Sequence, residues 1–201
     1  MLCRDAEFFK TAFNGSFQEG NDQSMSLPED DVQIFRIYRA WVYTGQLRYN
    51  FDEEECWLHL GKLWIFADKI CSPRLKNKTL DAFFELITKN REVPFPKPET
   101  VDYVYGKTMP DSALRRIFVR LFLYLYSTSG ADKMDLYPQE FLAMALRKAM
   151  FRIKTKSSGA LPASSTYHED CSETCCKHRS IAEPMSSSAH NKSLPRGAAE
   201  I

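Results

Sequence analysis

Two short segments, FNGSFQE at residues 13–19 and WVYTG at residues 41–45, are the most informative stretches of this sequence for its fold. The first ends a predicted helix over residues 4–14, whose apolar side is built from phenylalanines spaced i, i+4. Its Asn14-Gly15 pair is typical of a left-handed helix end. The second segment ends another predicted helix at Gly45. Together they predict an amino-terminal unit built mainly from helices.

Hydrophobic periodicity adds two short strands to this helical pattern. Residues 24–27 and 47–49 alternate apolar and polar side chains, which is typical of half-buried strands. Further helices are predicted over residues 28–44, 56–71, 75–87, 99–105, 111–126 and 138–153. The predicted fold class is therefore α/β, mostly helical, with a small sheet.

Composition divides the chain into four parts. Residues 1–89 form the first predicted unit, and the proline-rich residues 90–97 form a connector. Residues 98–154 are predicted to form a helical extension. Residues 155–201 are rich in Ser, Ala and Pro, and we expect them to be disordered because they bury too little apolar surface.

Charge and composition restrict the classes of partner. The formal net charge of this 201-residue chain is +1, with 44% apolar residues and no evident basic stripe, so neither nucleic acid nor a membrane is expected as a partner. No apolar run approaches the roughly 20 residues of a membrane span. We expect no signal peptide before the first helix and no disulfide framework among the cysteines. The prediction is an intracellular protein, cytoplasmic or nuclear.

The order of these elements and their motifs resembles the BTB/POZ domain, and especially the large fungal group of such proteins. That family implies a sheet flanked by two helical hairpins, here over residues 1–89, and a role in binding proteins. Two strands that the family places before the first helix have no counterpart, so we expect an amino-terminally truncated domain. The residues that carry the resemblance are Leu2-Cys3, Phe8-Phe9, Phe13, Phe17, Glu19, Leu27-Pro28-Glu29-Asp30, Trp41-Val42-Tyr43-Thr44-Gly45 and Ala67-Asp68.

Phe17 and Glu19 form a hydrophobic-any-acidic pattern that some BTB adaptors use to bind a cullin ubiquitin-ligase scaffold. A protruding aromatic side chain would fill a pocket on the scaffold while the carboxylate meets a basic rim. The alternative is that Phe17 packs on the core and Glu19 is solvated. Phe8 and Phe9, together with Leu2 and Cys3, are candidates for a homodimer face, and the alternative is that they pack under the two strands that the family places before the first helix.

The carboxy-terminal tail contains a group of Cys and His residues of metal-ligand type. Its candidates are Cys171, Cys175, Cys176 and His178, but their spacing lacks the two separated pairs of most zinc sites. Incidental reduced thiols are the simpler interpretation, so no metal or cofactor is predicted.

Enzyme motifs are missing: the sequence contains no P-loop, dinucleotide-binding, zinc-protease or nucleophile-elbow pattern. Acidic runs at residues 29–31 and 52–55 stand at predicted helix starts, where carboxylates are stabilised by the helix dipole. The hypothesis is a non-catalytic protein-interaction module that self-associates or recruits a partner. The alternatives are a cullin adaptor and a metal-binding protein.

Overall fold

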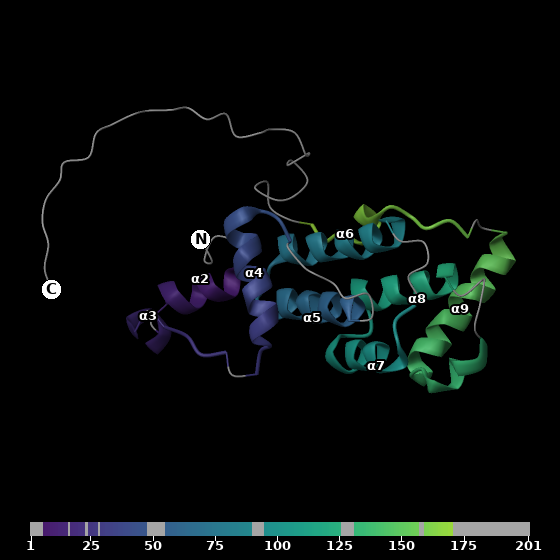
Figure 1. The fold of residues 1–201 in the computed structure, drawn as a ribbon, viewed down its shortest axis with the longest axis horizontal. Coiled ribbons are helices and arrows are strands. Elements are labelled where there is room, and N and C mark those ends of the chain that lie inside the picture. The colour runs from purple at the N-terminus through teal and green to yellow at the C-terminus, as the bar shows by residue number, and fades with distance from the viewer. Residues whose placement is uncertain are drawn as a thin grey trace, which may run out of the picture.

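Helices form the whole of the interpretable architecture (Figure 1). The computed structural model describes residues 6–15, 17–22, 24–27, 29–47, 55–89, 95–125, 131–156 and 159–170. The α-helices are α2 (Glu7–Asn14), α3 (Gln18–Asp22), α4 (Val32–Thr44), α5 (Cys56–Lys69), α6 (Pro73–Lys89), α7 (Pro98–Lys107), α8 (Ala113–Leu125) and α9 (Gln139–Thr155). Two 3₁₀ turns, η1 (Ala131–Leu136) and η2 (Ser164–Tyr167), complete the elements.

The predicted α/β class is wrong for the described residues, because they form helices and irregular segments without a strand. Residues 24–27, predicted as a strand, are irregular. Met25 and Leu27 instead pack against a cluster of aromatic side chains from the helices. Their alternate positions therefore place them against helices rather than on one face of a sheet. Of the second predicted strand, Leu47 is irregular and residues 48–50 lie outside the described part of the chain.

Helix α5 is the central element, because its buried side chains belong to two hydrophobic clusters. Leu63 and Phe66 pack in a front cluster with α2 and α4, whereas Leu60 and Trp64 pack in a rear cluster with α6 to α9. Figure 1 shows this order along the long axis, with α2 to α4 at one end, α5 and α6 in the middle and α9 at the other end. Helix α4 buries only one face, through Ile34, Tyr38 and Trp41.

Helix α4 shows how local signals set its ends. Asp31 is the N-cap, and its carboxylate accepts a hydrogen bond from the backbone N–H of Gln33 at 2.9 Å. Gly45 ends the helix in the left-handed region at φ 71°, as predicted. Gly15, by contrast, ends α2 in an extended conformation at φ −82°, so the predicted left-handed stop there is wrong.

The rear cluster continues across the proline-rich residues that the sequence predicts as a connector. Phe95 stacks on Phe141 of α9 with ring centroids 5.9 Å apart, and its ring also meets Phe118 and Phe122 of α8. The hydroxyl of Tyr137 donates a hydrogen bond to the carbonyl of Pro96 at 3.0 Å. Helices before and after the connector therefore share one core.

Residues 159–170, within the region predicted to be disordered, lie along α6 (Figure 1). The Asn77 side-chain amide exchanges two hydrogen bonds with the backbone of Glu169, at 2.8 and 2.9 Å. Asp81 accepts a hydrogen bond from Ser164 at 2.6 Å and lies 2.8 Å from Nε2 of His168. These contacts hold the segment, here called the strap, against α6.

Candidate protein-interaction site

Helix α9 buries less of its apolar surface than its sequence predicts. The apolar stripe that helical spacing indicates for residues 138–153 consists of Leu142, Ala145, Leu146, Ala149 and Ile153. Only Ala145 of that stripe is buried, beside Phe141, which the stripe omitted. The helix meets the core along the edge of its apolar face, and most of that face is left uncovered.

Three large apolar side chains on this face reach solvent at helical spacing, and we call them the α9 stripe. Leu146 is 63% exposed, Met150 is 62% exposed and Ile153 is 79% exposed. Their i, i+4, i+7 spacing places them on one side of the helix. A contiguous exposed apolar surface of this kind is characteristic of an interaction site.

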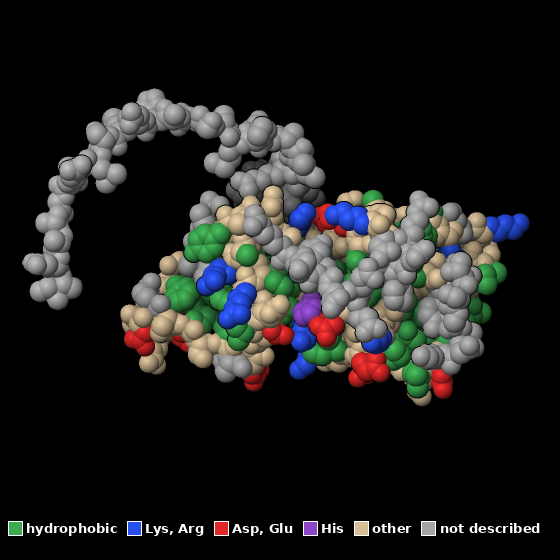
Figure 2. All heavy atoms as spheres, in the orientation of Figure 1, with side chains coloured by type: hydrophobic (Ala, Val, Ile, Leu, Met, Phe, Trp, Pro, Cys, Tyr) green, Lys and Arg blue, Asp and Glu red, His purple; other side chains and the backbone are tan. Residues whose placement is uncertain are grey.

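The same helix carries a strong positive charge. Residues 141–156 contain five Lys and Arg and no Asp or Glu. Over residues 113–156 there are nine Lys and Arg against three Asp and Glu, a net charge of +6 in a chain whose total is +1. Figure 2 shows hydrophobic and basic side chains together at the surface of the end formed by α9. The surface therefore favours a partner that is apolar and acidic.

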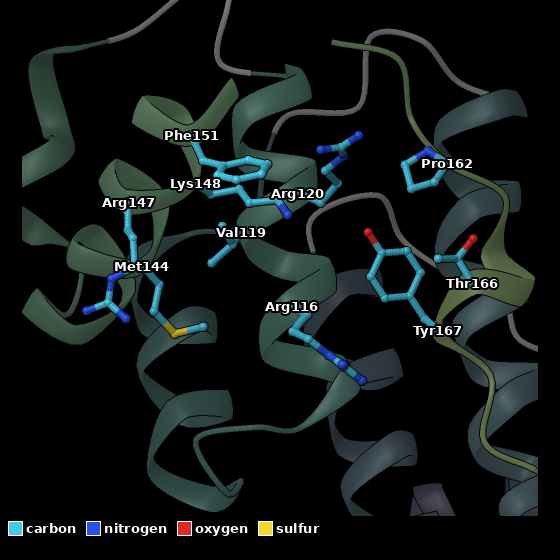
Figure 3. Close-up of a pocket in the computed structure, with 10 residues that line it drawn as sticks. All are labelled: Arg116, Val119, Arg120, Met144, Arg147, Lys148, Phe151, Pro162, Thr166 and Tyr167. Atoms are coloured by element: carbon cyan, nitrogen blue, oxygen red, sulfur yellow. The ribbon is translucent and has the colours of Figure 1, made fainter. Parts of the chain in front are cut away.

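A groove opens on another side of α9, between this helix, α8 and the strap (Figure 3). It encloses about 660 Å³ and is lined by four cations, Arg116 and Arg120 from α8 and Arg147 and Lys148 from α9. No described carboxylate forms an ion pair with any of these four side chains. We call this feature the basic groove.

A buried arginine positions α9 against the helices that form the groove. Arg115 of α8 donates hydrogen bonds to the carbonyls of Tyr105 and Thr108 at 2.6 and 2.5 Å, and to the Thr108 hydroxyl at 3.0 Å. It also pairs with Glu140 of α9 at 2.6 Å. Burial raises the pKa of the Tyr105 hydroxyl well above its usual range, and the Arg115 charge opposes that change. Arg115 thus joins α7, α8 and α9.

The residues predicted from the sequence as partner-binding lie at the opposite end of the molecule. Phe17 is 57% exposed just before α3, and Glu19 is half-buried within that helix. Phe9 is buried, stacked on Tyr38 with centroids 6.0 Å apart, and Phe8 is half-buried against it. Of these side chains, Phe17 is the most exposed.

The predicted metal candidates Cys171, Cys175, Cys176 and His178 lie outside the described residues. Within the described ranges, no group of three or more His, Cys, Asp or Glu side chains is placed to hold a metal ion. Ser164, His168 and Asp81 do not form a nucleophile with its base, because the Ser164 hydroxyl donates to Asp81 rather than to His168. This cluster fastens the strap.

Comparison of the chain with protein-family models, curated proteins and solved structures found no match. The described helices include none with the length and apolar character needed to cross a membrane.

Sequence reasoning did not single out the α9 stripe or the basic groove as sites. The total charge of +1 concealed the local excess of positive charge, which a count of charged residues over residues 113–156 would have found. Tyr167 and the other strap residues of the groove carried no such signal, since their place depends on contacts with α6.

Proposed function

We propose that this chain is a non-catalytic module that binds a partner polypeptide through the α9 stripe. The observation that carries the proposal is the exposure of Leu146, Met150 and Ile153, each more than 60% exposed, on one side of a single helix. The absence of enzyme motifs from the sequence also supports a binding role.

Energetics indicate what the partner must supply. Burying three large apolar side chains contributes roughly 5–9 kcal/mol, taking about 1.5–3 kcal/mol for each. Association itself costs an estimated 4–15 kcal/mol in lost freedom of motion. The stripe alone would therefore give weak binding, and a tight partner must also use the surrounding lysines and arginines.

Charge favours a different polypeptide over a second copy of this chain. A symmetric dimer through α9 would bring two copies of Arg147, Arg152, Lys154 and Lys156 close together. Like charges facing each other across an interface are unfavourable. A partner with an apolar helix face bordered by carboxylates would complement both the stripe and its cations.

Site-specific photo-crosslinking in the full chain tests the proposal. A photoreactive residue in place of Met150 is expected to capture one discrete polypeptide, which then binds the purified chain directly. The matched control is the same residue in place of Met109, which is 75% exposed in the turn after α7 and should capture nothing in common.

Matched substitutions separate specific from general effects. Leu146→Ser with Ile153→Ser should abolish binding of the captured polypeptide, whereas Val32→Ser, at a position 64% exposed on α4, should not. A basic amphipathic helix is also typical of proteins that lie on membranes. Flotation of the chain with protein-free anionic vesicles, lost in the same double variant, would therefore contradict the proposal.

The exposed Phe17 supports a second candidate, recruitment of a cullin scaffold. Under this hypothesis Phe17→Ala with Glu19→Ala abolishes cullin capture while the circular dichroism spectrum is unchanged. Capture that is unaffected by the double substitution would eliminate it.

A further inference from the structure

We propose that the basic groove binds a small amphipathic anion, in which a phosphate or carboxylate group is joined to an apolar chain. This site is separate from the α9 stripe and does not depend on the protein-binding function proposed above. The inference rests on the shape of the groove, its unpaired cations and its apolar walls.

The groove has the dimensions and construction of a ligand site. Its volume of about 660 Å³ lies within the range of 300–1,000 Å³ that is usual for small-molecule sites. Three segments of the chain enclose it: α8, α9 and the strap, as Figure 3 shows. In that view Arg116 and Arg120 lie between the α9 wall and the strap wall.

No carboxylate among the described residues is paired with the cations in the groove. Arg120 donates one hydrogen bond, from Nη2 to the carbonyl of Ala160 at 2.9 Å. Its Nε–H is buried and has no partner among the described residues. A buried donor without an acceptor is unfavourable, and an anionic ligand would satisfy it. Arg116 and Lys148 form no ion pair with a described carboxylate that would compete for that ligand.

The hydroxyl of Tyr167 lies within the electrostatic influence of two arginines of the groove. Its ring forms part of the strap wall and packs on Phe84 of α6, with centroids 6.0 Å apart. Burial raises the pKa of its hydroxyl, while the positive charges of Arg120 and Arg116 act in the opposite direction. The two guanidinium groups therefore act at one place, the side of the groove where an anionic head group would bind.

The remaining walls suit the apolar part of the ligand. Val119, Met144 and Phe151 line the groove beside the cations. Lys148 lies over the Phe151 ring, 5.8 Å from its centroid, so its ammonium group stays near the apolar wall. A ligand with charge alone would leave these apolar walls hydrated, and an apolar ligand would leave the cations unpaired.

Isothermal titration of the full chain with octyl phosphate tests the proposal. We expect saturable binding at one site, with inorganic phosphate and 1-octanol each binding at least about tenfold more weakly because each supplies half of the interaction. Absence of octyl phosphate binding would overturn the proposal, as would equal affinity for inorganic phosphate. Equal binding of octyltrimethylammonium would show detergent-like adsorption and would also overturn it.

Substitutions then locate the site. Arg116→Gln with Arg120→Gln should weaken octyl phosphate binding by about tenfold or more, because two charge-assisted hydrogen bonds are lost. Arg116→Gln with Lys148→Gln should do the same without touching the Arg120 contact to the strap. The matched control, Arg36→Gln with Arg39→Gln on the exposed side of α4, should bind as the unmodified chain does.

The binding of a partner by the α9 stripe and the binding of an anion by the basic groove can be refuted independently of each other. Leu146→Ser with Ile153→Ser should leave octyl phosphate binding unchanged while it abolishes the partner interaction. If groove variants and control variants bind octyl phosphate equally, the groove is not the site, whatever the result of the crosslinking.

Discussion

Replacement of Arg115 by methionine should destabilise the rear half of the molecule by about 2–4 kcal/mol. Tyr105 lies in the last turn of α7, where carbonyl groups have no partner within the helix. Arg115 supplies donors to the Tyr105 and Thr108 carbonyls, and its side chain is 5% exposed. The buried Tyr105 carbonyl left without a donor costs about 1–3 kcal/mol, and the part-buried Thr108 carbonyl adds about 1 kcal/mol. Methionine retains much of the packing of the arginine stem.

The ion pair with Glu140 adds little to this estimate. The Glu140 side chain is 54% exposed, so its charge is well solvated whether or not Arg115 is present. Glu140→Gln should therefore cost less than about 1 kcal/mol. Arg115→Lys should be intermediate, because an ammonium group cannot reproduce the planar arrangement of guanidinium donors.

Urea denaturation at pH 7, followed by far-ultraviolet circular dichroism, measures these free energies of unfolding. Hydrogen exchange provides a second measurement, since faster exchange in α7 and the first turns of α9 is expected in Arg115→Met. A methionine variant within about 0.5 kcal/mol of the unmodified chain would refute the argument that these carbonyls depend on Arg115.

Three further substitutions test other parts of the structure. Phe141→Ala should cost about 3–5 kcal/mol by calorimetry, because the ring meets Phe122 at 5.0 Å and Tyr137 at 5.6 Å in the core; a cost below 1 kcal/mol would contradict that packing. Asp31→Ala should cost about 1 kcal/mol at pH 7 through loss of the α4 cap. The hydrogen bond from Lys62 lowers the pKa of Asp31 in the folded chain. The stability difference between the unmodified chain and Asp31→Ala should therefore be fully present above the ordinary carboxyl pKa and be lost as pH falls through the lowered pKa of Asp31. A stability difference that does not change with pH would contradict this account. Lys62→Met should raise the pKa of Asp31 in a carbon-detected NMR titration, and an unchanged pKa would show that Lys62 is not its cause.

The strongest local signals predicted their elements correctly. Gly45 ends a helix in the left-handed conformation, and the predicted apolar stripe over residues 56–71 gives the buried face of α5 as far as Ala67. Its last residue, Cys71, lies beyond the helix and is exposed. These features depend on residues close in sequence, which is why a pattern identifies them. The predicted sheet depended on two stretches of three or four residues, where alternation cannot distinguish a strand from an extended segment packed on helices.

The proposed interaction site was harder to predict, because it depends on which part of the helix surface the rest of the chain leaves uncovered. The periodicity of α9 correctly indicated an apolar face, but periodicity does not tell whether that face meets the chain's own core or a partner. The strap was missed for a related reason. Its contacts are polar, such as the paired hydrogen bonds between Asn77 and Glu169, and a composition argument counts only apolar burial.

Oxidation of Met150 relative to Met109 tests the central claim most directly, because the two methionines are 62% and 75% exposed in the same molecule. In the purified chain, dilute hydrogen peroxide should oxidise both within about twofold of each other, since oxidation follows exposure. In cells that produce the chain at its normal abundance, peptide mass spectrometry should show Met150 protected and Met109 still reactive, because a bound polypeptide covers the α9 stripe. Equal oxidation of the two methionines in cells would contradict the account.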